Sequence, residues 1–211
     1  VEVYLASEFR YCDPIVDEGT LAIVISQSGE TLDTMAALRE AKARGARVLS
    51  IVNVVGSSIA RESDDVLYTW AGPEIAVATT KAYSTQLALV AQLAIYLAGA
   101  RKTLSEERYA ALVAALERLP DQVAQVLAHQ DEIQYFASQF FNHESIFFIG
   151  RNLDYAVGLE GSLKLKEISY IHSEAYASGE LKHGTISLIE PGTLVVALGA
   201  YTPLFDKAMS N

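Results

Sequence analysis

The sequence predicts an α/β protein in which parallel sheets carry helices on both faces, so that each lobe has three layers. Two short, continuous apolar runs, Leu21–Ser26 and Ser145–Gly150, have the pattern of strands buried on both sides. A polar turn and then a stretch with helical spacing follow each run. Strands that alternate with helices favour parallel pairing through helical crossovers. Because the pattern occurs twice, we expect two lobes and, between them, a helical connection.

The first expected lobe covers residues 1–100. The segment that starts at Val1 reads as the middle of a strand. Gly45 suits the end of the first helix, because glycine tolerates the left-handed conformation that follows a helix C-terminus. The further elements predicted for this lobe are a helix at Leu32–Arg44, a strand at Val48–Val52, a short helix at Ala60–Ser63, a strand at Val66–Thr69 and a long helix at Thr80–Leu97.

The helical connection is expected over residues 101–141 and the second lobe over residues 142–211. In the connection, Pro120 separates a helix predicted at Ser105–Leu119 from another at Asp121–Phe141. In the second lobe, the strand at Ser145–Gly150 leads into a polar turn. The elements predicted after it are a helix at Tyr155–Ile171 and a strand at Leu194–Leu198.

Composition narrows the class of protein. The 211 residues carry a formal net charge of -10, which disfavours a protein that reads the phosphate backbone of nucleic acid. Cys12 is the single cysteine, so no internal disulfide and no Cys/His metal site are expected. The apolar stretch Leu87–Ala98 is too short to cross a bilayer, and no signal peptide is visible. These features indicate a cytoplasmic protein.

The turn Ser26–Thr31, with the sequence SQSGET, is a candidate phosphate site. It joins a strand to a helix, at the place where ligands bind in parallel α/β sheets. Unpaired amides of a helix N-terminus attract anions, and Gly29 allows a close approach of the backbone. Hydroxyls of Ser26, Ser28 and Thr31 can donate further hydrogen bonds. Caps and ordinary Ser-Gly turns share this pattern, but three hydroxyls and a glycine in six residues favour a site.

The second candidate is a charged face on the helix of the second lobe. Glu160, Lys164 and Glu167 are spaced so that they share one side of a helix. A solvated stripe of ion pairs would look the same. Apolar neighbours suggest instead a largely buried helix, in which such charges need partners or a function. His183, in the following Gly-bounded stretch, is of a type that exchanges protons near neutral pH.

These segments resemble the isomerase part of the glutamine–fructose-6-phosphate aminotransferase family, which is built from two sugar isomerase (SIS) domains of flavodoxin-like fold. The resemblance covers nearly the whole chain in order, and the run from Glu160 to Gly184 is more specific than SQSGET. The matching segments are Ser26–Thr31, Val77–Lys81, Glu160–His172 and Glu174–Gly184.

The resemblance implies a role for each candidate residue, without metal or cofactor. Glu167 would move a proton between C1 and C2 of fructose 6-phosphate, and Lys164 would assist at the C2 oxygen. His183 would open the sugar ring in the site of a neighbouring subunit, which implies a homodimer. A partly buried carboxylate suits proton transfer between adjacent carbons. The residues that would bind the phosphate and hydroxyls of the sugar are Ser26, Gln27, Ser28, Thr31 and Thr79.

The sequence departs from the family pattern at both ends. A glutaminase domain, expected upstream, is not part of the sequence, and the first lobe would lack its first strand and turn. The second lobe would end before a C-terminal lysine that forms an imine with the sugar. Two alternatives stay open. One is an SIS-type sugar-phosphate deaminase or deglycase, and the other is a sugar-phosphate sensor without catalysis.

Overall fold

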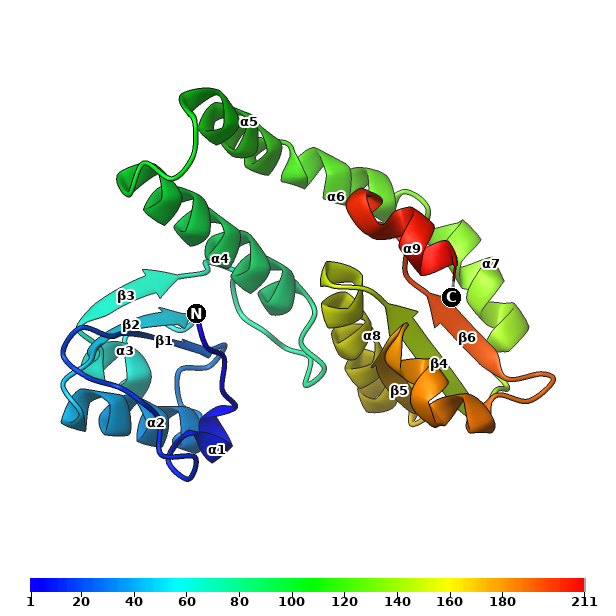
Figure 1. Cartoon of the computed structure of the whole chain (residues 1–211), viewed down its shortest axis with the longest axis horizontal. Coiled ribbons are helices and arrows are strands. Elements are labelled where there is room, and N and C mark those ends of the chain that lie inside the picture. The colour runs from blue at the N-terminus through cyan, green and yellow to red at the C-terminus, as the bar shows by residue number, and fades with distance from the viewer. Residues whose placement is uncertain (211) are drawn as a thin grey trace. The chain divides into compact units, whose positions relative to one another are not determined.

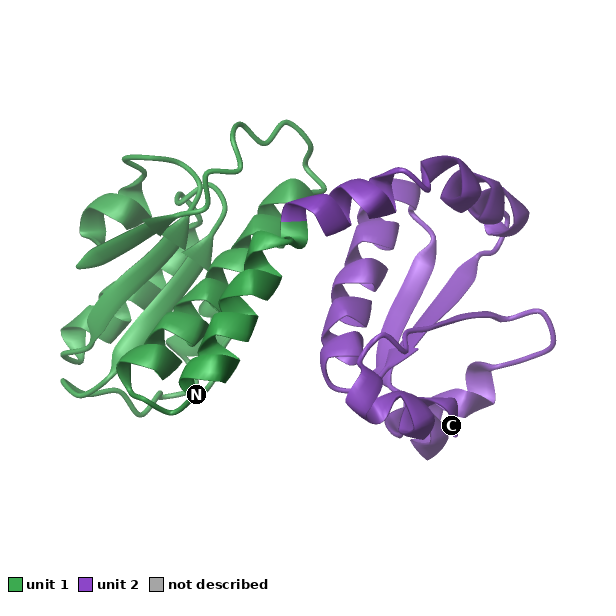
Figure 2. Cartoon of the chain, turned by 90° about the horizontal axis from the view of Figure 1, so that it is seen from above, with its two compact units in different colours: residues 1–119 green, residues 120–211 purple. Residues whose placement is uncertain are grey.

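The structure, a computed structural model, describes residues 1–210 as two compact units (Figure 2). Unit 1 is Val1–Leu119 and unit 2 is Pro120–Asn211. Each unit contains a parallel sheet with helices, so the predicted α/β class is confirmed. Among the described residues, no helix combines the length and apolar character that a membrane crossing requires.

Unit 1 is built on a sheet with the strand order β1-β2-β3 (Figure 1). Both strand pairs are parallel, with Leu21 opposite Arg47 and Leu49 opposite Asp65. The turns that follow the strands therefore meet at one edge of the sheet, the carboxyl edge. The elements are β1 Leu21–Ser26, α2 Leu32–Ala43, β2 Arg47–Val52, α3 Ser58–Glu62, β3 Asp65–Tyr68 and α4 Lys81–Ala100.

The core of unit 1 lies on the face of the sheet that α2 and α3 cover. Val24 and Val48 pack there against Leu38 of α2 and Ile59 of α3. The opposite face is less covered, since Leu21, Ile23 and Ile25 each keep 42–45% of their surface exposed. The expectation that β1 is buried on both sides is therefore wrong. A hollow of about 540 Å³ separates this face from α4.

The ends of unit 1 differ from the prediction. Residues 1–5 form no strand, and a one-turn helix, α1 (Ala6–Phe9), follows them. After α4, the helix α5 (Glu106–Glu117) is capped by Ser105, whose hydroxyl accepts a hydrogen bond from the Arg108 amide. This cap satisfies one of the unpaired amides at the helix start.

In unit 2, two helices replace the single one expected at Asp121–Phe141. They are α6 (Leu119–Leu127) and α7 (Gln130–Phe140). Pro120 does not break α6, because it lies in the first turn, where the missing N–H costs no helical hydrogen bond.

The sheet of unit 2 has the strand order β5-β4-β6, and both pairs are parallel. The helix α8 (Leu153–Ser169) packs against β4 and β5, and Figure 1 shows α7 on the other side of the sheet. The remaining elements of unit 2 are β4 Ser145–Gly150, β5 His172–Ala177, the 3-10 helices η1 Glu180–His183, η2 Thr185–Leu188 and η3 Thr202–Leu204, β6 Leu194–Ala197 and α9 Phe205–Met209.

The strand β5 was not predicted. The helix expected to run to Ile171 ends at Ser169, because Tyr170 takes a left-handed conformation with φ 62°. Glycine is the usual signal for such an ending, and it is absent here. The side chains of β5 alternate, and Ser173 is buried while His172 is exposed. The other four residues, Glu174, Ala175, Tyr176 and Ala177, are half-buried, and the strand lacks the β-branched residues that are typical of strands.

Candidate functional site

The turn at residues 26–31 lies at the carboxyl edge of the unit 1 sheet, as predicted. The Ser26 hydroxyl is buried and accepts a hydrogen bond from the Gly29 amide (3.1 Å). It also lies 2.9 Å from the hydroxyl oxygen of Thr31. Gly29 has φ +68°, a conformation that glycine adopts without strain. Ser26 and Thr31 therefore hold the turn in shape.

The remaining polar groups of the turn are more open. Gln27 and Ser28 are half-buried, and Thr31 is exposed. The Ser28 hydroxyl accepts from the Glu30 amide (3.2 Å), which leaves its own proton free to donate to a ligand. The helix α2 begins directly after the turn, at Leu32, with its unpaired amides at the same edge of the sheet. This arrangement can hold a small anion.

The segment that follows β2 supports the turn from the side. The Asn53 amide donates to the Gln27 carbonyl (3.0 Å), and the Ile59 amide donates to the Gly29 carbonyl (3.0 Å). The Glu30 carboxylate accepts from the Ser58 amide (2.8 Å). Sequence reasoning assigned no role to Glu30 or to this segment, because contacts across 26–30 positions leave no local pattern.

The loop after β3 is fixed by Asn53. Its side-chain oxygen accepts from the Ala71 amide (2.8 Å) and the Thr69 hydroxyl (3.0 Å), and its nitrogen donates to the Gly72 carbonyl (2.8 Å). This loop leads to Thr79, which is half-buried and whose amide donates to Val77. No hydrogen bond among residues 1–210 joins Thr79 to the turn at residues 26–31.

In unit 2, α8 lies close to the sheet through small residues. A β-carbon on Gly161 would be 3.2 Å from the Phe148 ring, and Gly158 is buried. The buried hydroxyls of Ser162 and Ser173 lie 2.9 Å apart and join α8 to β5. Two residues along a helix correspond to a rotation of about 200° around its axis, so Glu160 lies on the side opposite Gly158.

The charged face of α8 has the predicted arrangement. The Lys164 ammonium donates a short hydrogen bond to the Glu167 carboxylate and lies 3.6 Å from a Glu160 oxygen. The side chains of Lys164 and Glu167 are 20% and 33% exposed. The hydrogen bond to the Glu167 carboxylate is the main cause that raises the pKa of Lys164 above its ordinary value, and the negative charge of Glu160 raises it further. Lys164 therefore stays a cation at neutral pH and holds Glu167 in place.

The expectation that α8 is largely buried is wrong. Ile168 is 64% exposed and Tyr170 at the helix end is 92% exposed. The charges nevertheless do not form a fully solvated stripe, because Lys164 and Glu160 keep only about a fifth of their side-chain surface. The face is thus a paired cluster at the border of an exposed apolar surface.

Glu167 and His183 lie at opposite ends of β5. The helix α8 runs back from the carboxyl edge of the sheet, so Glu167, two residues before its end, lies near the amino edge. His183 is exposed in η1, which follows the carboxyl end of β5. A strand of six residues is about 20 Å long. The fold therefore does not bring these two side chains together within one chain.

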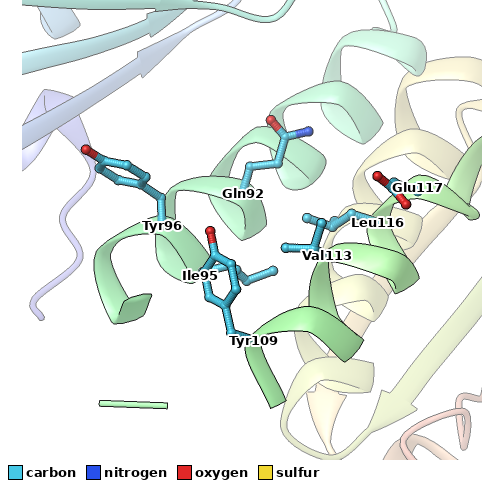
Figure 3. A pocket seen from close by; sticks show the side chains of 7 residues that line it. All are labelled: Gln92, Ile95, Tyr96, Tyr109, Val113, Leu116 and Glu117. Atoms are coloured by element: carbon cyan, nitrogen blue, oxygen red, sulfur yellow. The ribbon is translucent and has the colours of Figure 1, made fainter. Parts of the chain in front are cut away.

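The turn at residues 26–31 belongs to unit 1, and Glu167, Lys164 and His183 belong to unit 2. A separate hollow of about 330 Å³ lies between α4 and α5 (Figure 3). Its lining is mainly apolar, and Glu117 is its one carboxylate. It does not lie at the carboxyl edge of the sheet, where the polar groups gather.

Comparison with known proteins identifies the family of the chain. The SIS domain matches residues 1–96 and 139–207. The chain is 59% identical over all 211 residues to a glutamine–fructose-6-phosphate aminotransferase [isomerizing] of Clostridium acetobutylicum. It spans only 35% of the length of that relative.

Two solved structures extend the comparison. The C-terminal domain of glucosamine–fructose-6-phosphate aminotransferase from Francisella tularensis matches 99% of this chain and 59% of its own, with a TM-score of 0.95 and 42% identity. A glucosamine-6-phosphate deaminase from Thermotoga maritima matches 97% of this chain and 63% of its own, with a TM-score of 0.73 and 27% identity. By its sequence match and its fold, the chain belongs to the SIS domain family.

Proposed function

We propose that this chain is the isomerase part of a glutamine–fructose-6-phosphate aminotransferase, which makes glucosamine 6-phosphate from fructose 6-phosphate and ammonia. The observation that carries the proposal is the pairing of Glu167 with Lys164. A carboxylate held by a cation on a half-covered helix face suits proton transfer. The similarity to enzymes that carry this name, over the whole chain, supports the same reaction.

The phosphate of the sugar would bind at the turn of unit 1. Amides at the start of α2 and the free proton of the Ser28 hydroxyl offer donors to phosphate oxygens. Gln27 would bind a sugar hydroxyl. Ser26 and Thr31, which bond to each other, would act mainly by keeping the turn in shape. Thr79 would add a hydroxyl from the start of α4.

The chemistry would take place at C1 and C2. Ammonia from glutamine, supplied by a glutaminase domain outside these 211 residues, would form an imine at C2 with loss of water. Glu167 would then take a proton from C1 and return it to C2, while the C1 hydroxyl loses its proton and the nitrogen gains one, which yields the open-chain amino sugar. The Lys164 cation would stabilise negative charge that develops at the C2 substituent.

His183 would open the sugar ring in the site of a second subunit. The separation of Glu167 and His183 along β5 supports this arrangement, because one chain does not unite them. We therefore propose a homodimer in the cytoplasm. The alternative of a deaminase has weaker support, since the deaminase is 27% identical and the aminotransferases reach 60%.

Isotope exchange tests the assigned base. In the intact enzyme of which we propose this chain is a part, fructose 6-phosphate in heavy water should take up deuterium at C1. Glu167→Gln should slow this uptake by about 10²- to 10⁴-fold, because general-base catalysis commonly contributes that much. Glu190→Gln, which removes an exposed carboxylate from the same unit, serves as control. Uptake at the parent rate with Glu167→Gln would refute the proposal.

A further inference from the structure

We propose that Glu30 is a positioning residue that fixes the shape of the phosphate turn by binding the Ser58 amide. The inference rests on the proposed function for its ligand, a phosphate monoester. Glu30 is the one charged residue of the turn. A carboxylate at this place would repel a phosphate dianion, so we expect Glu30 to have a role other than contact with the ligand.

The contact with the Ser58 amide gives that role. The Ser58 amide donates to Oε1 of Glu30 at 2.8 Å, and the next amide, of Ile59, donates to the Gly29 carbonyl at 3.0 Å. Two consecutive amides of one segment thus bind two consecutive residues of the turn. Together they fix both the side chain and the backbone of the turn against α3.

The carboxylate is held in its charged form by the same contact. The Ser58 amide is the main cause that lowers the pKa of Glu30, and the Arg61 cation adds to it. Arg61 itself donates to the Ser58 hydroxyl (3.1 Å) and to the Gly56 carbonyl. The Glu30 carboxylate therefore points to the segment that contains Ser58 and Arg61, and the Arg61 cation offsets its negative charge there.

Packing supports the same assignment. Ser57 is 3% exposed and lies directly against Gly29, where a β-carbon would be 2.0 Å from the Ser57 oxygen. Such close contact leaves the turn no room to move toward this segment. Loss of the Glu30 contact would leave only backbone hydrogen bonds, from the Asn53 and Ile59 amides, to hold the turn from this side.

Two measurements on the 211-residue chain test the inference. The first is the dissociation constant for fructose 6-phosphate, and for inorganic phosphate, by calorimetry. The second is hydrogen exchange of the Ser58 and Ile59 amides without ligand. Glu30→Ala should raise the dissociation constant about tenfold and speed both exchange rates by a similar factor, as expected for one lost charge-assisted hydrogen bond.

Two further variants sharpen the result. Glu30→Gln keeps an acceptor oxygen and should restore both values to within about twofold of the parent. Glu62 lies in α3, like Ser58, and its carboxylate binds Arg39 of α2. Glu62→Ala removes that carboxylate and should change neither value. The inference is overturned if Glu30→Ala changes nothing, or if Glu30→Gln is as weak as Glu30→Ala. Failure of the parent chain to bind either probe would contradict the proposed function, whereas the exchange rates test the support of the turn without any ligand.

Discussion

The hydroxyl oxygen of Ser57 lies so close to Gly29 that a β-carbon on the glycine would be 2.0 Å from it. The Ser57 β-carbon would be 2.5 Å away. Gly29→Ala therefore meets two costs, a steric clash and a positive φ of 68°. We expect this variant to lose at least about 2 kcal/mol of unfolding free energy in urea titrations.

A second substitution separates the two costs. Ser57→Gly removes both clashing atoms but leaves the positive φ of residue 29 unchanged. The double variant Gly29→Ala/Ser57→Gly should therefore be less destabilised than the sum of the single variants, with a coupling of about 1 kcal/mol or more. Additive losses would show that the Ser57 contact is not what requires glycine at this position.

Ser57→Ala should stabilise unit 1. The Ser57 hydroxyl is buried and has no hydrogen-bond partner among residues 1–210. An unpaired buried hydroxyl is unfavourable, so its removal should raise the unfolding free energy by about 1 kcal/mol in the absence of ligand. A lower midpoint in urea would mean that the hydroxyl has a partner in solution.

The ion pairs of Lys164 predict a pH dependence. Glu167 and Glu160 raise its pKa above 10.5, so its contribution to stability is complete below that value and is lost as the pH rises through the raised pKa. The melting temperature of Lys164→Met should lie below that of the parent from about pH 7 to 10, and the difference should shrink above this range. A difference that stays constant up to about pH 12 would contradict the pairing.

Mixing of two inactive variants tests the shared site. If His183 serves the site of the neighbouring subunit, a dimer of one Glu167→Gln and one His183→Asn subunit has one intact site and one doubly defective site. Random exchange of subunits should then restore about a quarter of the parent activity. If both residues acted within one chain, every site would carry a defect and no activity would return.

The sequence predicted the elements whose signal is local. The apolar run of β1 and the helical spacing of α2 lie where expected, at Leu21–Ser26 and Leu32–Ala43. The shared face of Glu160, Lys164 and Glu167 follows from helix geometry and is confirmed by their contacts. The strand β5 escaped prediction, because a left-handed tyrosine ends α8 and the strand contains no β-branched residue.

The support of the turn at residues 26–31 could not be predicted. Glu30 stands in the turn motif, but its partner, Ser58, is 28 positions away and offers only a backbone amide. A backbone donor has no signature in the sequence, since every residue except proline carries one. The same holds for Ile59 and Gly29, which meet only because β1 and β2 are neighbours.

The most direct test of the account is a titration of the 211-residue chain with fructose 6-phosphate, followed through backbone amide signals by NMR. We predict saturable shifts that are largest for residues 27–32 and that fructose without phosphate does not produce. Shifts confined to the hollow of α4 and α5, or no shift at millimolar sugar phosphate, would contradict the central claim that this turn binds the phosphate.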